Sequence, residues 1–180
     1  KDVIPYCNKL SDGAKKIGAV NTIVKEKDGT LSGYNTDYYG FLYMLNSANV
    51  DVKGKKAIVL GSGGASKAVY HGLLSLGIQP VFVSRTPNKG QLSYAQLTPE
   101  VMAEYTVIVN TTPLGMYPNI DVCPDIPYEL LSSDHLLYDL LYNPDETLFM
   151  RKGKEQGAVV KNGLEMLLLQ AFAAWDIWNS

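Results

Sequence analysis

From residue 54 onward the chain alternates short apolar runs with longer segments of helical pattern, and this alternation restricts the fold more than any other feature. The helical segments include one after the glycine turn at 61–66, one that starts at Thr98-Pro99 and one at 145–156. Strands joined by helices run parallel in one sheet, because each helix returns the chain to the same edge. We therefore predict an α/β fold with a doubly wound parallel sheet. The expected strands are at 57–60, 79–85, 106–112, 135–144 and 157–163.

The first 48 residues have a different pattern and precede this sheet. Residues 1–16 carry apolar side chains at near-helical spacing, which predicts a helix. Asp28-Gly29 lies between two β-favouring runs, which predicts a hairpin, and a further helix is expected over 37–48. At the other end of the chain, 162–178 is apolar almost all round, so we expect a buried or interface helix there.

Composition excludes several classes of function. The chain has 16 basic and 18 acidic residues, a formal net charge of -2 and no dominant basic stripe, so neither nucleic acid nor an anionic membrane is expected as a partner. No apolar run approaches the roughly 18 residues of a membrane span. Cys7 and Cys123 lie far apart, without a CxxC pattern or a nearby histidine, so we expect no metal site and a reducing cytoplasm as the location.

A glycine-rich turn follows the first strand of the sheet and opens a helix, which is the context that gives such a turn chemical meaning. Gly61 permits the tight turn, and Gly63 lets the backbone approach a pyrophosphate. The start of the helix offers free N–H groups to that anion. We interpret the turn as a dinucleotide site; a turn with only a structural role is the alternative.

The loop after the second strand indicates which dinucleotide would bind. NAD sites usually carry an acid about 20 residues after the glycine turn, where it binds the ribose 2′-hydroxyl. Here Ser84, Arg85 and Thr86 occupy that place, and Lys89 follows. Arg and Lys suit a 2′-phosphate, which a carboxylate would repel. We therefore expect NADP rather than NAD, unless the loop is only a solvated basic segment.

With these motifs in place, the chain resembles the shikimate dehydrogenases, the NADP-dependent reductases of 3-dehydroshikimate in aromatic amino-acid biosynthesis. The resemblance implies an N-terminal substrate domain, a C-terminal Rossmann-like NADP domain and an active site in the cleft between them. It also implies that NADPH supplies a hydride to the ketone while the protein supplies position and a proton. The matching blocks occur in family order: GAVNT (18–22), GYNTDYYG (33–40), GSGGASKA (61–68), SRT (84–86), NTTPLGM (110–116), YDLLYNPDET (138–147) and NGLEMLLLQA (162–171).

Carried over residue by residue, the resemblance implies a substrate site and a cofactor site. Shikimate hydroxyls would be bound by Asn21 and Asp37 from the substrate-domain side, and by Tyr142 and Gln170 from the cofactor-domain side. The pyrophosphate would be held by Gly61, Ser62, Gly63, Gly64 and Ala65, and the 2′-phosphate by Ser84, Arg85, Thr86 and Lys89. The nicotinamide half would be lined by Thr111, Thr112, Met116, Leu140, Gly163 and Met166. Ser84 departs from the asparagine that is commoner in the family.

Several of these residues have a structural alternative. Asp37 could be only the first-turn acid of a helix, and Asn21 could bond only to backbone. Tyr142 could belong to the ordinary core. Gln170 lies on an otherwise apolar helix and would need a partner if it were buried, which favours contact with a ligand.

Catalysis in the family depends on a lysine that we do not find in this chain. The family pairs its aspartate with a lysine in a segment that resembles NVTxPxK, and that lysine aligns immediately before residue 1; Lys1 aligns one position after it. The serines that bind the substrate carboxylate in the family are also absent. We therefore expect a piece of a longer protein that binds NADP(H) but is inactive alone, because an ionised Asp37 is a poor proton donor.

The expected organisation has three parts: 1–48, a remnant of the substrate domain with a linking helix; 49–160, the Rossmann-like NADP domain; and 161–180, a helix that packs back toward the substrate cleft. The expected ligands are NADP and shikimate or 3-dehydroshikimate, and a homodimer is one open assembly. Two other functions stay open: a paralogue that prefers quinate or an amino-shikimate, and an NADP-binding module without catalysis. The retained substrate-side residues argue against the module.

Overall fold

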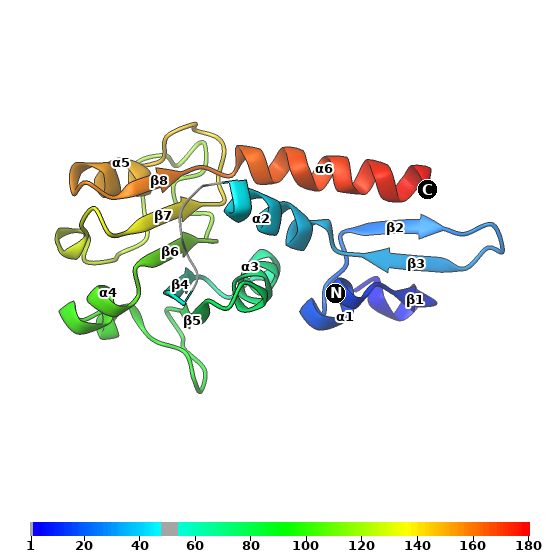
Figure 1. Ribbon diagram of the computed structural model, residues 1–180, viewed down its shortest axis with the longest axis horizontal. Helices are drawn as coiled ribbons and strands as arrows, with labels where there is room; N and C mark the ends of the chain where they lie inside the picture. Colours follow the sequence, from blue (N-terminus) through cyan, green and yellow to red (C-terminus); the bar gives the residue numbers. More distant parts are fainter. Residues whose placement is uncertain (1, 48–53) are drawn as a thin grey trace.

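The computed structural model describes residues 2–47 and 54–180, which form two β-sheets with helices packed against them (Figure 1). The smaller sheet has the strand order β1-β3-β2, with β1 at Lys9–Leu10, β2 at Thr22–Lys25 and β3 at Leu31–Tyr34. β2 and β3 are antiparallel around a turn in which Gly29 has a φ of 84°. The hairpin predicted at Asp28-Gly29 is therefore confirmed.

The helix predicted over residues 1–16 is wrong for most of its length, and Lys1 lies outside the described residues. A 3₁₀ turn, η1 (Ile4–Tyr6), and strand β1 precede a helix of only 6 residues, α1 (Asp12–Ile17). The intervening backbone is extended because it bonds to the hairpin: the Asn8 N–H donates to the Leu31 carbonyl oxygen at 2.8 Å. Ser11 then caps α1 through its side chain. Pairing with the hairpin outweighs the helical spacing of the apolar residues.

The larger sheet confirms the predicted fold class, because its strands all run parallel in the order β5-β4-β6-β7-β8. The chain leaves β4 toward β5 and leaves β6 toward β7, in opposite directions. In such sheets a crevice opens between the carboxyl ends of the two strands where the direction changes. The strands are β4 (Lys56–Leu60), β5 (Gln79–Val83), β6 (Val107–Asn110), β7 (Leu136–Asp139) and β8 (Val159–Lys161).

Helices cover both faces of this sheet. Alternate strand residues point to opposite faces, so Ala57 and Val59 pack with α2, α3 and α6, whereas Ile58 and Leu60 pack with α4 and α5. Both faces are therefore closed to water, as a parallel sheet requires. The helices are α2 (Thr36–Ser47), α3 (Gly64–Ser75), α4 (Pro99–Glu104), α5 (Leu148–Glu155) and α6 (Leu164–Asn179), with short turns η2 (Tyr94–Gln96) and η3 (Tyr128–Leu130).

Helix α2 belongs to the N-terminal segment in sequence but packs into the core of the larger sheet. Phe41 and Met44 on this helix are buried against α3 and the sheet. Gly40 allows α6 to cross closely, since a Cβ at this position would lie 2.8 Å from the Met166 carbonyl oxygen. The helix thus connects the two sheets. The boundary predicted between residues 48 and 49 lies outside the described residues.

Helix α6 runs from the larger sheet to the hairpin (Figure 1), where the Trp178 Nε1 donates to the Ile23 carbonyl oxygen at 3.1 Å. Of the two alternatives predicted for this helix, burial is wrong for most of its residues, and the interface role stays a prediction. Phe172 and Trp175 have exposed fractions of 63% and 64%, and within the helix only Met166 and Ala174 are buried. None of the helices in the described residues has the length and apolarity needed to cross a membrane.

Tyr138, on β7, carries an unpaired polar group in the core. Its side chain is 1% exposed, and its hydroxyl has no hydrogen-bond partner in the described part of the chain. An unsatisfied buried hydroxyl costs about 1–3 kcal/mol. We expect Tyr138→Phe to raise the free energy of unfolding by about 1 kcal/mol in urea denaturation. Tyr128→Phe is the matched control and should lower it, because the Tyr128 hydroxyl donates to the Pro124 carbonyl oxygen at 2.9 Å. A lower free energy of unfolding for Tyr138→Phe would show that the Tyr138 hydroxyl does have a hydrogen-bond partner.

Candidate functional site

A cavity of about 570 Å³ opens at the carboxyl ends of β4, β6 and β7, between α2 and α6. It coincides with the crevice that the strand order creates. All residues predicted for the substrate and for the nicotinamide half lie in its wall, together with Ala65 of the glycine turn: Asn21, Asp37, Thr111, Thr112, Met116, Leu140, Tyr142, Gly163, Met166 and Gln170. Pro113, Leu141 and Leu167 complete the wall and had no predicted role.

Polar side chains from three elements meet at one end of this cavity. Asn21 Oδ1 accepts the N–H of Thr36 at 2.9 Å, at the start of α2, and Thr36 Oγ1 donates to Gln170 Oε1 of α6 at 3.2 Å. Asn21 does bond to backbone through its carbonyl oxygen, as its structural alternative proposed, and its side chain also forms a hydrogen bond with Asp37. Thr36 is fully buried and had no predicted role. The only sequence signal for it is its place between Asn35 and Asp37.

Asp37 is the second residue of α2, and its carboxylate lines the cavity. Burial raises the pKa of this carboxyl group, and a hydrogen bond from Asn21 opposes the shift. No cation among the described residues contributes to this pKa shift. An acid in the first turn of a helix is stabilised by the helix dipole. The two predicted roles of Asp37, as a first-turn acid and as a group that faces a ligand, are therefore compatible.

The loops after β6 and β7 form the opposite wall. Tyr142 is 49% exposed, so its alternative role as a core residue is wrong. Gly163, directly before α6, lies against the β7 loop: its N–H donates to the Leu141 carbonyl oxygen at 2.9 Å. A Cβ on Gly163 would lie 2.0 Å from the Leu140 carbonyl oxygen. Only glycine fits here, and it brings the start of α6 to the edge of the cavity.

The glycine turn has room for a pyrophosphate. Gly61 has a φ of 101°, and a Cβ there would lie 2.9 Å from Thr111 Oγ1, so the β4 turn and the β6 loop touch at the crevice. Gly63 is the N-cap of α3 and has no side chain to bond the first N–H groups. Ser62, Gly63 and Gly64 are exposed, and both glycines have open space where a Cβ would lie. An anion can therefore reach the free N–H groups of α3.

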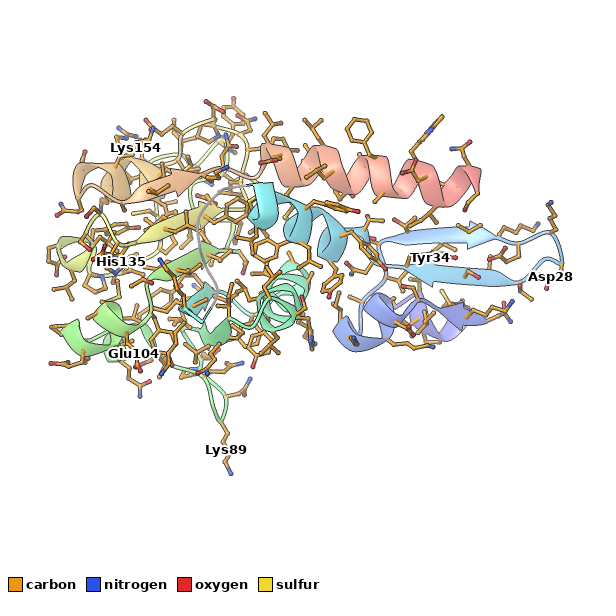
Figure 2. The ribbon with its side chains drawn as sticks, viewed as in Figure 1. Asp28, Tyr34, Lys89, Glu104, His135 and Lys154 are labelled. Carbon is orange, nitrogen blue, oxygen red and sulfur yellow. The ribbon has the colours of Figure 1, made fainter. Side chains whose placement is uncertain are left out.

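The loop that follows β5, residues 84–89, carries Arg85 and Lys89 and is called the basic loop. It starts beside the glycine turn, because the Gly61 N–H donates to the Val83 carbonyl oxygen at 2.9 Å. Ser84 is 9% exposed, and its Oγ accepts the Thr86 N–H at 3.2 Å, which shapes the loop. Arg85, Thr86 and Lys89 are exposed, and Lys89 projects from the tip of the loop (Figure 2). Two cations therefore follow β5 on the side of β4 away from the cavity.

Two polar residues that end β6 and β7 were missed by the sequence reasoning. Asn110 and Asp139 are both fully buried, and the Asn110 Nδ2 donates to Asp139 Oδ1 at 3.0 Å across the paired strands. Burial raises the pKa of Asp139 to about 6, although hydrogen bonds from its neighbours lower it. The available signal was a polar residue that closes each apolar run, in VIVN and in LLYD.

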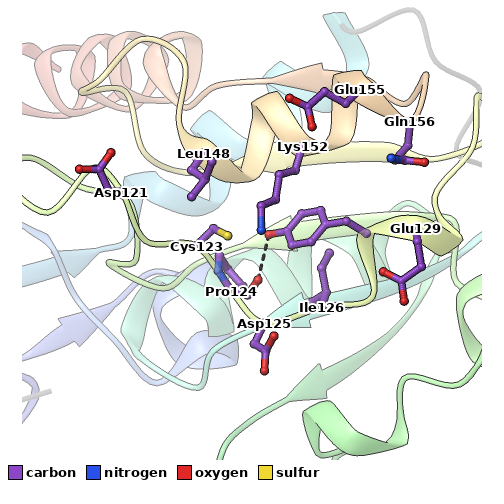
Figure 3. A pocket seen from close by; sticks show the side chains of 11 residues that line it. Asp121, Cys123, Pro124, Asp125, Ile126, Glu129, Leu148, Lys152, Glu155 and Gln156 are labelled. Atoms are coloured by element: carbon purple, nitrogen blue, oxygen red, sulfur yellow. Dashed lines mark hydrogen bonds between the residues drawn. The ribbon is translucent and has the colours of Figure 1, made fainter.

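A second pocket, of about 550 Å³, lies beside η3 and α5 (Figure 3) and contains none of the predicted site residues. Its one lysine, Lys152, lies 4.8 Å from the centre of the Tyr128 ring. Carboxylates dominate the rest of its charged wall: Asp121, Asp125, Glu129 and Glu155. Because these carboxylates repel a phosphate, this pocket does not suit a nucleotide, whereas the first cavity holds the residues predicted for one.

Comparison with known proteins identifies the family. No protein-family model matches the chain. The NADP(+) shikimate dehydrogenase of Carboxydothermus hydrogenoformans is 42% identical over 191 residues, which cover 98% of this chain and 68% of that protein. The chain belongs to the shikimate dehydrogenase family.

Solved structures of shikimate dehydrogenases share its fold. A chorismate mutase/shikimate 5-dehydrogenase fusion protein from Clostridium acetobutylicum is 40% identical with a TM-score of 0.88, over 99% of this chain and 66% of that one. The enzyme of Thermus thermophilus in complex with NADP(H) and shikimate is 32% identical with a TM-score of 0.85, over 98% of this chain and 68% of that one. The chain thus spans about two thirds of the length of these shikimate dehydrogenases.

Proposed function

We propose that this chain is the NADP(H)-binding part of a shikimate dehydrogenase, which reduces 3-dehydroshikimate to shikimate, together with part of its substrate site. The observation that carries the proposal is the single cavity in which Asn21, Asp37 and Gln170 face the loops that follow β4, β6 and β7. Membership of the family supports it, as does the NADP(H) and shikimate bound by the Thermus relative.

The residues present fit NADP(H), which supplies the hydride for the reduction when it is bound. The glycine turn, from Gly61 to Ala65, would hold the pyrophosphate on the free N–H groups of α3. Arg85 and Lys89, with Ser84 and Thr86, would bind the 2′-phosphate. The nicotinamide half would lie against the mostly uncharged wall formed by Thr111, Thr112, Met116, Leu140, Gly163 and Met166.

The substrate end of the cavity would bind hydroxyl groups. Asp37 and the Gln170 carbonyl oxygen accept hydrogen bonds, whereas the amide groups of Asn21 and Gln170 and the hydroxyl of Tyr142 donate them. This mixture suits a polyhydroxylated acid. An ionised Asp37 accepts a hydrogen bond from a substrate hydroxyl and does not donate a proton to the developing alkoxide. We expect the proton to come from the family's lysine, which aligns immediately before residue 1.

We propose a matching division of the chain. Residues 1–48 would belong to the substrate-binding part with a linking helix, 49–160 would form the NADP-binding unit, and 161–180 would return to the substrate cleft. The bond from Trp178 to the hairpin supports the return of the last segment. Phe41 of the linking helix packs in the core of the larger sheet, which supports counting this helix with the NADP-binding unit as well.

Titration calorimetry with NADPH and NADH tests the cofactor proposal. We expect NADPH to bind at least about tenfold more tightly, because charge-assisted hydrogen bonds to a phosphate contribute about 1.5–3 kcal/mol. Equal affinity for both nucleotides, or binding of neither, would contradict the proposal. With shikimate and NADP(+) we expect no turnover from the chain alone, as followed by NADPH absorbance. The same assay with quinate separates the two substrates in a longer protein that turns over.

A further inference from the structure

We propose that Asp139 is a positioning residue for the cofactor cavity, and that its buried carboxylate holds the loops after β6 and β7 at a fixed spacing. This inference rests on the proposed function, since these loops are the ones assigned to the nicotinamide half. Asp139 does not line the cavity itself. It acts through Asn110 and through the backbone of Leu141.

The carboxylate accepts hydrogen bonds at both of its oxygens. Oδ1 accepts from Asn110 Nδ2 at 3.0 Å and from the Leu141 N–H at 3.1 Å, and Oδ2 accepts from Thr147 Oγ1 at 2.6 Å. Asp139, Asn110 and Thr147 are each 0% exposed. Hydrogen bonds to a charged group are stronger than neutral ones, and groups this deeply buried cannot exchange them for bonds to water. The geometry at this strand end is therefore tightly restrained.

Asn110 carries the restraint into the β6 loop. Its Oδ1 accepts both the N–H of Thr112 at 3.0 Å and the hydroxyl of Thr112 at 2.7 Å. The Leu114 N–H then donates to Thr112 Oγ1 at 3.3 Å. Since Thr112 and Met116 both line the cavity, the carboxylate restrains this wall through a single amide side chain.

Leu141 carries the restraint into the β7 loop. Its N–H donates to Asp139, and its carbonyl oxygen accepts the N–H of Gly163 at 2.9 Å. Leu141 and its neighbours Leu140 and Tyr142 line the cavity, and Gly163 immediately precedes α6. The same carboxylate thus restrains a second wall and the start of the helix that carries Gln170.

A contribution to folding stability does not explain why a carboxylate is buried at this position. Asp139 takes part in none of the ion pairs between described residues. Burial raises its pKa to about 6, and its three hydrogen-bond partners all donate to it, as they would to an ionised carboxylate. Tyr128 and Tyr138, whose pKa values its charge helps to raise, are uncharged at neutral pH. A buried charge without a counter-ion opposes folding. Its position at the junction of two cavity loops therefore points to a role in holding them.

The test compares Asp139→Ala with Asp139→Asn by calorimetry, using NADPH and 2′-phospho-ADP-ribose, which lacks only the nicotinamide. Alanine removes every acceptor, so we expect the affinity for NADPH to fall at least about tenfold. The affinity for 2′-phospho-ADP-ribose should change by less than about twofold. Asparagine keeps a carbonyl for Asn110 and Leu141 and can donate to the Thr147 hydroxyl. We expect it to restore NADPH affinity to within about threefold of the unmodified chain.

Controls separate positioning from general loss of stability. Met102→Ala opens a void beneath α4, on the face of the sheet away from α2 and α6, and should weaken NADPH and 2′-phospho-ADP-ribose to the same extent if it affects them at all. If Asp139→Ala does not fold, Asn110→Ala can replace it, because it leaves the bonds from Leu141 and Thr147 to Asp139 intact. It should also weaken NADPH binding while leaving the affinity for 2′-phospho-ADP-ribose nearly unchanged. Equal weakening of both ligands, or NADPH affinity as poor with asparagine as with alanine, would overturn the proposal.

A measurement without ligand keeps this inference separate from the proposed function. Failure of the unmodified chain to bind either ligand would contradict the proposed function. Amide hydrogen exchange would still test the network: in Asp139→Ala it should become faster at 111–116 and 140–143 and stay unchanged at the glycine turn. Unchanged exchange in those two loops would refute the positioning role.

Discussion

Replacing Gly163 by alanine is expected to lower the free energy of unfolding by at least about 3 kcal/mol. A Cβ there would lie 2.0 Å from the Leu140 carbonyl oxygen and 2.5 Å from its carbonyl carbon. Because both atoms belong to the backbone, no side chain can rotate away, and either the β7 loop or the start of α6 must move. The change is measured by urea denaturation, and NADPH titration of the folded fraction should show weakened binding.

Gly64→Ala is the matched control for Gly163→Ala. Gly64 begins α3 and has open space where a Cβ would lie. Alanine also favours the helical conformation by about 1 kcal/mol over glycine, so this variant should be as stable as the unmodified chain or slightly more so. An unchanged denaturation midpoint for Gly163→Ala would contradict the close approach of α6 to the β7 loop.

Removing both cations of the basic loop, with Arg85→Ala and Lys89→Ala together, is expected to weaken NADPH binding about 100-fold. Charge-assisted hydrogen bonds contribute about 1.5–3 kcal/mol each, and 1.4 kcal/mol corresponds to a factor of ten. NADH lacks the 2′-phosphate, so its affinity should change by less than about threefold. Parallel calorimetric titrations with the two nucleotides measure both effects.

The control for this double variant removes the same charge elsewhere. Lys25→Ala with Lys27→Ala takes two exposed lysines from the hairpin and should leave both affinities unchanged. Added salt should reduce the NADPH preference of the unmodified chain, because exposed charges are screened. If NADPH and NADH affinity fall together in the Arg85 and Lys89 variant, the loop acts on the adenosine half in general and not on the 2′-phosphate.

The parallel sheet could be predicted because buried strands and amphipathic helices alternate along the chain with little interruption. The segment around Asn8 could not, because its extended conformation comes from backbone bonds to Leu31, which is distant in sequence. The same limit applies to α6. Its apolar composition predicted a buried or an interface helix, but whether Phe172 is covered depends on what packs against the helix, and periodicity carries no such information.

In the candidate site too, some residues could be predicted from the sequence and others could not. The resemblance to the shikimate dehydrogenases implied Asn21, Asp37 and Gln170 one by one, and the structure places all three in one cavity wall. Asn110 and Asp139 were missed because each looks like the polar end of an apolar strand. Their role depends on pairing between β6 and β7, a relation that neither residue reveals alone.

Helix α6 fixes the distance between two residues that line the cavity. It begins at Leu164, directly after its N-cap Gly163, and near its other end Trp178 bonds to the hairpin. Met166 and Gln170 lie 4 positions apart on it and face the same cavity. Their axial separation is therefore set by the helix rise, about 6 Å. Under the proposed function, Met166 lines the nicotinamide half and Gln170 contacts a substrate hydroxyl, so a single helix would set the spacing between these two groups.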